Sequence, residues 1–166
     1  MDPISRTLEF TYQRFSTFNS YSMTPQLIFT VCNTVAIAGW LVLLFFPFWY
    51  DSDKYIVGIV ITLFCIVYAW LIFSSFPLTN IPKFATLAGV KSIFMQEEMV
   101  VAGWVHYLAF DLLTGIFIRR NSIKHGISPW IIFPILLITF ALGPIGLLLY
   151  LIVRSVASRR YFVENF

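Results

Sequence analysis

Four long apolar stretches constrain this chain more than any other feature of its sequence. A helix that crosses the hydrocarbon core of a bilayer needs about 20 predominantly apolar residues. Four stretches meet this requirement, near residues 25–48, 55–76, 97–118 and 129–153. Only 11% of the residues are charged, whereas a soluble globular domain carries about 25%. The sequence therefore predicts an all-α integral membrane protein with a four-transmembrane-helix bundle.

The remaining segments are short and lie at the ends or in the loops. Residues 1–22 place apolar side chains near helical spacing, which predicts an N-terminal interfacial amphipathic segment. Residues 77–96 contain two prolines and predict a short interfacial helix or a surface loop rather than a fifth span. The expected domains are thus 1–22, a transmembrane domain over 23–158, and a C-terminal tail over 159–166. Gly143 and Pro144 predict a kink in the fourth span.

The loops and tails give an expectation for targeting and orientation. Residues 1–22 have no continuous apolar core, so no cleavable signal peptide is predicted, and Asp2 and Glu9 argue against a transit peptide. Four crossings would place both termini on one side. Lys and Arg are more numerous in the tails and the middle loop than in the other two loops, which predicts cytoplasmic termini. A multi-pass protein of the cell inner membrane or of a thylakoid-like membrane is expected.

The third span is unlike the others because it contains ionisable side chains. His106 and Asp111 both lie well inside this apolar stretch. An ionisable group at bilayer depth is costly, so such residues usually face the protein interior or a cavity and mark a working site. His106 and Asp111 are therefore the candidate catalytic residues.

Helical geometry separates these two residues. At about 100° per residue, Trp104, Tyr107 and Thr114 fall on the same side of the helix as Asp111. His106 projects about 140° away from Asp111. A His–Asp contact within the helix is therefore not expected, and both could serve one pocket only if that pocket wraps around the helix.

Structural roles compete with the functional interpretation of these polar residues. Asp111 could pair with Arg119 or Arg120 or bond to a threonine on another helix, and His106 could be a packing residue within the bundle. Asn33 in the first span could form a hydrogen bond with the third helix, or it could orient a substrate oxygen. Glu98 stands in the first turn of the third span, where a carboxylate complements the helix dipole.

Several other classes of site find no support in the sequence. His106 and His125 are the only histidines and lie on different elements, so no metal site is predicted. No phosphate-binding glycine loop or nucleophile elbow is present, and no cofactor is expected. Cys32 and Cys65 lie in apolar runs and are predicted to be buried free thiols. The net charge of +3 is dispersed, which does not favour nucleic-acid binding.

Two motifs resemble a known family when they are read in order. WVHYLAFDL over residues 104–112 and LGPIGLLLY over residues 142–150 resemble the core of the abscisic-acid-deficient-4 family, which is associated with neoxanthin formation. The pair Asn33-Thr34 is also similar to that family's first helix. The chain looks closer to bacterial-type members, because it shows no transit peptide.

This resemblance implies chemistry on a carotenoid or a related isoprenoid, by rearrangement of an epoxide end group into an allenic one. Opening the epoxide needs a proton on the oxygen, and the new double bond needs a proton removed from carbon. We therefore expect Asp111 to act as acid, His106 as base and Asn33 to hold the oxygen. The expected substrate-binding residues are Asn33, Trp104, Tyr107 and Glu98.

Two further readings stay open. The protein could be a non-catalytic membrane protein that binds a lipid or pigment or assembles a complex, or it could be a small transporter subunit. An enzyme predicts that His106 and Asp111 border one lipid-accessible pocket, and a binding protein predicts an apolar slot without them. The expected partners are a lipophilic isoprenoid substrate and membrane lipid, with a homo-oligomer or a partner membrane protein left open.

Overall fold

Helices make up the part of the chain that the structure describes. The computed structural model describes residues 24–46 and 52–159, and each secondary-structure element within these two ranges is helical. The predicted all-α class is therefore confirmed. The interfacial segment predicted over 1–22 and the tail beyond residue 159 lie outside the described residues.

The first long helix, α2, spans Pro25–Phe45 and has a well-formed start. The hydroxyl of Thr24 accepts a hydrogen bond from the Leu27 amide at 3.2 Å, and Pro25 occupies the first helical position, where no amide donor is needed. One face of α2 is buried against the bundle through its small and apolar residues, which are Ile28, Cys32, Ala36, Gly39, Trp40 and Leu43. The predicted span is confirmed.

The second span is a continuous helical run with a wider turn inside it. It comprises α3 (Ser52–Tyr55), a π-helical segment (Ile56–Ile61) and α4 (Thr62–Ser75). The Thr62 hydroxyl donates to the carbonyl of Val57, five residues earlier, at 3.0 Å. The run ends where predicted, because Pro77 favours extended backbone at Phe76.

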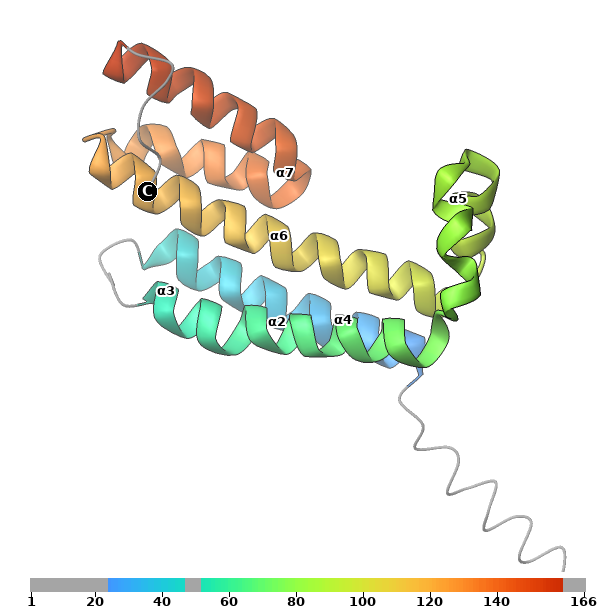
Figure 1. Cartoon of the computed structure of the whole chain (residues 1–166). Helices are drawn as coiled ribbons and strands as arrows, with labels where there is room; N and C mark the ends of the chain where they lie inside the picture. Colours follow the sequence, from blue (N-terminus) through green and yellow to red (C-terminus); the bar gives the residue numbers. More distant parts are fainter. Residues whose placement is uncertain (1–23, 47–51, 160–166) are drawn as a thin grey trace, which may run out of the picture.

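Two short helices follow and form a separate lobe at one end of the bundle (Figure 1). They are a 3₁₀ helix over Leu78–Ala85 and α5 over Leu87–Ile93. Thr86 begins α5 by accepting a hydrogen bond from the Gly89 amide at 3.1 Å. Neither helix is long enough to cross a membrane, so the expectation of no fifth span in this region is confirmed.

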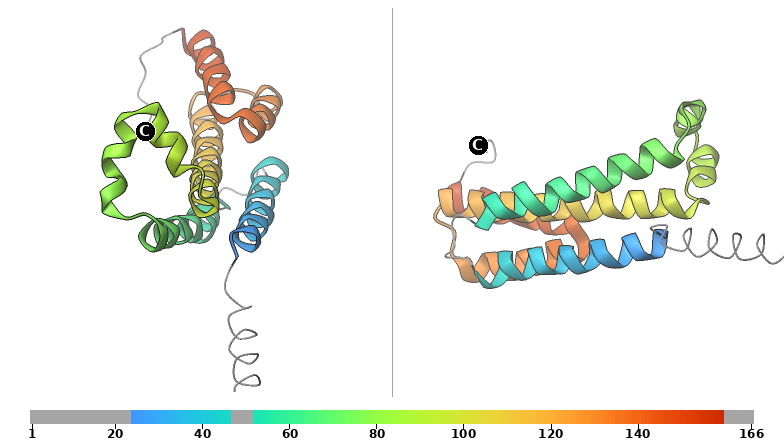
Figure 2. Two further views of the ribbon diagram at one scale, coloured as in Figure 1. Left: turned by 90° about the vertical axis from the view of Figure 1, so that its right-hand side faces the viewer. Right: turned by 90° about the horizontal axis from the view of Figure 1, so that it is seen from below.

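The central helix is α6, which spans Glu97–Lys124. It packs against α2, α4 and α7 and lies between them in the end-on view of Figure 2. Of its most apolar stretch, 56% is buried, against 17% for the second span. The predicted end at Ile118 is wrong, because Arg119 and Arg120 continue the helix and find a partner inside the bundle.

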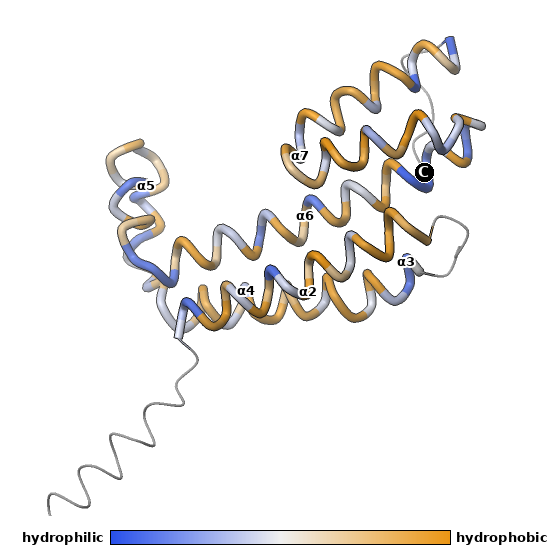
Figure 3. The backbone as a smooth tube through the Cα atoms, turned by 180° about the vertical axis from the view of Figure 1, so that it is seen from behind, coloured by the Kyte–Doolittle hydropathy of each residue, from blue (hydrophilic) through white to orange (hydrophobic). Residues whose placement is uncertain are grey.

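The last helix, α7, spans Pro129–Ser158 but is broken in the middle. Leu142 and Gly143 leave helical geometry, with φ/ψ of −142°/38° and 6°/−77°. Pro144 follows directly and cannot donate the amide hydrogen bond that a continuous helix needs. Figures 1 and 3 show that the two arms fold back on each other, so the predicted kink is confirmed as a sharp turn.

Four helical runs are therefore long and apolar enough to cross a membrane: Pro25–Phe45, Asp53–Ser75, Glu97–Lys124 and Pro129–Ser158. Most residues of α2, α4 and α7 are apolar, as Figure 3 shows, and large apolar side chains such as Leu41, Phe73 and Leu148 are exposed on them. The interior consists of two apolar clusters along α6. One joins the first half of α6 to α2 and α4 through residues such as Ala36, Phe64 and Val105. The other joins its second half to α2 and α7 through residues such as Leu43, Leu112 and Ile135.

Candidate functional site

A buried carboxyl group lies at the centre of the bundle. Asp111 stands midway along α6 and is only 7% exposed. Its Oδ2 atom has no hydrogen-bond partner among the described residues. A buried polar atom without a partner costs free energy, and such atoms in native proteins are often explained by a catalytic role or a bound group.

The break in α7 faces this carboxyl. A Cβ atom built on Gly143 would collide with Oδ1 of Asp111, so the carboxyl occupies the space that a side chain would otherwise fill. One turn earlier on α6, the Tyr107 hydroxyl donates a hydrogen bond to the Ala141 carbonyl at 3.3 Å. Tyr107 also neighbours the Asp111 carboxyl. The polar side chains of Tyr107 and Asp111 therefore both contact α7 at the break in its helix.

Because Asp111 lies so close to Gly143, we expect that one methyl group added at Gly143 destabilises the protein. Gly143→Ala is expected to lower the free energy of unfolding by about 1–3 kcal/mol, the usual cost of forcing extra atoms into a packed interior. Thermal unfolding in detergent, followed by the loss of helical circular dichroism, would measure it. Gly58→Ala is the control, since a Cβ there meets nothing within 4 Å. Equal melting temperatures for the two variants would contradict the packing described.

Asn33 links α2 to the same face of α6. The Trp104 Nε1–H donates to Asn33 Oδ1 at 3.0 Å, and Asn33 Nδ2 donates to the Phe29 carbonyl at 2.7 Å. The Trp104 and Tyr107 rings lie 5.4 Å apart. The interpretation of Asn33 as a hydrogen-bonding partner of the third helix is confirmed. Asn33, Trp104, Tyr107 and Asp111 thus form one continuous polar and aromatic strip.

His106 lies on another side of α6, as its position in the helix predicts. His106 is exposed on the surface of the bundle. Its ring lies next to those of Phe110 and Tyr68, with centroid distances of 4.5 and 5.7 Å. It lines a cavity of about 320 Å³ between α4, α5 and α6, beside aromatic residues such as Phe94. Asp111 faces α7 instead. The structure therefore does not bring these two candidate catalytic residues together.

Glu98 is also apart from the strip. It is half-buried in the first turn of α6, at the end of the helix that adjoins the short helices. In that position it complements the helix dipole. Residues 24–46 and 52–159 contain no group of three His, Cys, Asp or Glu side chains that could hold a metal ion.

Sequence reasoning missed a buried ion-pair cluster at the other end of α6. Arg119 and Arg120 both bind the carboxylate of Asp53, at the start of the second span. Asp53 is 2% exposed and Arg119 is 5% exposed. The suggested pairing of Asp111 with one of these arginines is therefore not found. The sequence contains a signal for this ion-pair cluster. It is an acidic residue at the start of one apolar span together with a pair of arginines at the end of the next.

A second polar group lies nearby and ties α7 to α6. The Tyr150 hydroxyl donates to Asn121 Oδ1 at 2.6 Å, and Arg154 Nη1 lies 3.4 Å from the same oxygen. Asn121, Tyr150 and Arg154 are all buried. Their contacts fix the second arm of α7 against the final turns of α6.

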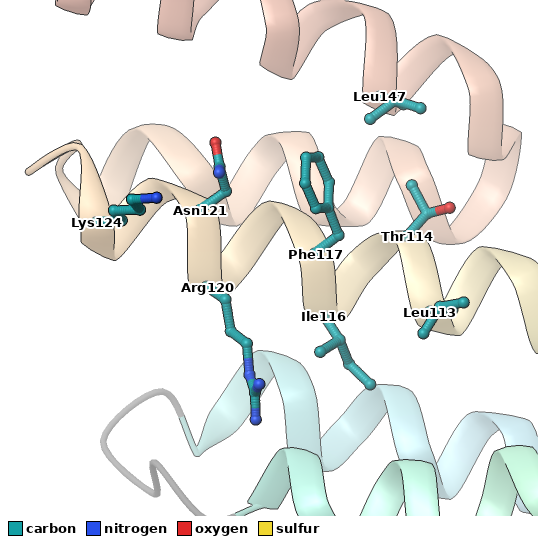
Figure 4. Close-up of a pocket in the computed structure, with 8 residues that line it drawn as sticks. All are labelled: Leu113, Thr114, Ile116, Phe117, Arg120, Asn121, Lys124 and Leu147. Carbon is teal, nitrogen blue, oxygen red and sulfur yellow. The ribbon is translucent and has the colours of Figure 1, made fainter. Parts of the chain in front are cut away.

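An open groove runs between α6 and the second arm of α7 (Figure 4). Its volume is about 750 Å³, and Leu147 points across it toward Phe117. Most of its lining is apolar, whereas Arg120, Asn121 and Lys124 lie at one end. Thr114, at the other end, stands one turn from Asp111 on α6. The groove is therefore open to an apolar molecule as far as Thr114, and Asp111 is not one of its lining residues.

A comparison with protein-family models decides the family. The model described as ABA DEFICIENT 4-like matches residues 27–150. The chain belongs to the ABA DEFICIENT 4-like family. The comparisons with curated proteins and with solved structures give no match. The matched range contains Asn33, the whole of α6 and the break in α7, so the resemblance expected from the motifs is confirmed. Membership of the ABA DEFICIENT 4-like family is consistent with a membrane protein of carotenoid- or abscisic-acid-related processes.

Proposed function

We propose that this protein is a membrane enzyme that isomerises a carotenoid or a related isoprenoid by proton transfer. The observation that carries the proposal is the Asp111 carboxyl, which is buried midway along the central span with one oxygen lacking a partner among the described residues. The substrate class comes from the family and from the apolar surfaces that surround this carboxyl. Such a substrate would reach the protein from the lipid phase.

One carboxyl group can carry both proton transfers of an epoxide-to-allene rearrangement. Asp111 gives its proton to the epoxide oxygen as the C–O bond breaks, and the bond electrons stay on oxygen. The resulting carboxylate then removes a proton from carbon, and the C–H electrons form the new double bond. The product is an isomer of the substrate, so no oxidant, reductant or other co-reactant is consumed.

The strip next to Asp111 supplies the positioning groups of this proposal. Tyr107 neighbours the carboxyl, and its hydrogen bond to the Ala141 carbonyl fixes its ring beside Asp111. Trp104 offers an aromatic surface for a polyene chain, and Asn33 fixes the Trp104 ring through its hydrogen bond. We assign His106 no proton transfer, because it faces a different cavity.

The direct test is pigment profiling in a carotenoid-producing host that expresses the full chain. We expect a new isomer of one host carotenoid with the native chain, and none with Asp111→Ala at equal protein level. Panels of hosts with epoxide-bearing and epoxide-free carotenoids would identify the end group required. Unchanged pigments in all of these hosts would contradict the proposal.

A substitution of His106 tests whether its role differs from that of Asp111. His106→Phe is expected to keep the conversion within about threefold of the native chain, because a phenyl ring preserves the stacking with Phe110 and Tyr68. Pigment conversion per folded protein would measure this. A loss with His106→Phe as large as that with Asp111→Ala would restore His106 as the base and would require a substrate that wraps around α6.

A second function is favoured by the separation of His106 from Asp111. A non-catalytic pigment- or lipid-binding protein needs an apolar slot without a convergent acid and base, and the cavity beside His106 is lined by aromatic and aliphatic side chains. This function predicts that a host carotenoid co-purifies with the chain and is chemically unchanged. The same purified samples therefore distinguish the two functions.

A further inference from the structure

The first arm of α7 begins beside the end of α6. The two helices are joined by a tight connection, in which the Ile127 amide donates to the Ser122 carbonyl at 2.9 Å. From there, residues 129–141 run back along α6 toward its middle (Figure 1). At the far end of this arm the Ala141 carbonyl accepts a hydrogen bond from the Tyr107 hydroxyl, and Gly143 lies against the Asp111 carboxyl.

The second arm then returns toward the end from which the first arm came. The Tyr150 hydroxyl and Arg154 both reach Asn121, in the last turns of α6. The two arms are packed closely just beyond the turn, since a Cβ atom on Gly146 would collide with Thr139 of the first arm. Figures 1 and 3 show the same hairpin from opposite sides.

Each arm is too short to cross a bilayer alone. At about 1.5 Å per residue the arms are each roughly 20 Å long, whereas the hydrocarbon core is about 30 Å thick. Apolar helices of this length are more typical of segments that re-enter the side from which they came. The broken backbone at the tip would have to be buried in protein. Two side chains of α6 contribute to this at the tip: the Tyr107 hydroxyl donates to the Ala141 carbonyl, and the Asp111 carboxyl lies against Gly143, which is buried.

We propose that α7 is a re-entrant hairpin that enters and leaves the membrane on the same face. The chain then crosses the membrane three times, through α2, the second span and α6. The end of α7 lies on the face opposite to the start of α2, in place of the shared side expected from four crossings. This inference depends on the geometry of α7 and is independent of the proposed reaction.

The charges of the two faces assign the orientation independently. The face at the ends of α6 and α7 carries six cationic residues among those described, which are Lys54, Arg119, Arg120, Lys124, Arg154 and Arg159, and one acidic residue, Asp53. The opposite face carries Lys83, Lys91, Glu97 and Glu98. Because Lys and Arg accumulate on the cytoplasmic side, we place the ends of α6 and α7 there.

Three single-cysteine variants of the full chain test both points. The background is Cys32→Ala with Cys65→Ala, expressed in a bacterial inner membrane. Ser92→Cys in α5 and Ser128→Cys before α7 mark the two faces, and Ser158→Cys reports the end of α7. Ala157→Cys is the substitute if Ser158→Cys does not accumulate. A membrane-impermeant maleimide is applied to intact spheroplasts and, separately, to permeabilised ones.

The hairpin predicts that Ser158→Cys behaves like Ser128→Cys and opposite to Ser92→Cys. The assigned orientation predicts that only Ser92→Cys reacts in intact spheroplasts, with at least tenfold more labelling than the other two. Labelling of Ser158→Cys together with Ser92→Cys would show that α7 crosses the membrane and would overturn the hairpin. Labelling of Ser128→Cys but not Ser92→Cys in intact spheroplasts would overturn the orientation.

Discussion

Asp53→Ala is expected to lower the free energy of unfolding by about 3–5 kcal/mol, which is the usual result of removing one partner from a buried ion pair. Asp53 is 2% exposed and binds both Arg119 and Arg120. Without this carboxylate, the Arg119 guanidinium would remain in the interior with its main counter-charge removed. The second span and α6 would then lose their strongest polar connection.

Thermal unfolding of the purified protein in detergent would measure this effect. Arg120→Ala is the matched control, because the Arg120 side chain is 59% exposed and Arg119 still neutralises Asp53 in that variant. We expect a change below about 1 kcal/mol for the control, as for other exposed ion pairs. Similar melting temperatures for Asp53→Ala and Arg120→Ala would show that burial of Arg119 does not control stability.

The local sequence predicts the helices well because membrane spans depend mainly on local composition. The start of α2 at Pro25 and the end of the second span before Pro77 follow from proline chemistry and apolar length. The end of α6 does not follow, because Asp53, the partner of Arg119 inside the bundle, belongs to another span. The size of the turn in α7 is likewise decided by tertiary contacts at Gly143 rather than by Pro144 alone.

In the candidate site, too, the features that depend on local helical geometry could be predicted, and those that depend on tertiary contacts could not. The spacing within α6 correctly separates His106 from Asp111 and groups Asp111 with Tyr107, because both relations depend only on helical geometry. The sequence does not show which helix packs against the side of α6 that carries Asp111 and Tyr107. Gly143 and Ala141 lie more than 30 residues away along the chain, and only folding brings them to α6. A hydrogen bond between Asn33 and the third helix was one of two roles that the sequence allowed, and the structure shows this bond with Trp104 as the donor.

Asp111→Asn is expected to lower turnover by at least about 100-fold, the lower limit for losing a positioned general acid. The amide has nearly the same shape as the carboxyl and fits the same space beside Gly143, but it cannot deliver a proton. Because the carboxyl carries its proton in the proposed mechanism, the amide replaces one neutral group with another, and we expect no loss of folding stability. The variant therefore separates a chemical role of Asp111 from a purely structural role in covering the break of α7.

Thr114→Val is the matched control for this substitution. Thr114 lies on the same helix, close to Asp111, and its hydroxyl bonds only to the Phe110 carbonyl among the contacts described. The change removes one polar group of similar size from the same part of the membrane. We expect turnover within about twofold of the native chain, which would show that losing a polar group at this depth does not itself abolish activity.

The most direct test of the account is the rate of pigment isomerisation by native and Asp111→Asn protein in the same membranes, normalised to folded protein by size-exclusion chromatography. The host carotenoid converted by the native chain serves as substrate, and separation of the pigments gives the rate. We predict a melting temperature close to that of the native chain with turnover reduced by at least about 100-fold. Full turnover by folded Asp111→Asn would contradict the assignment of Asp111 as the proton donor.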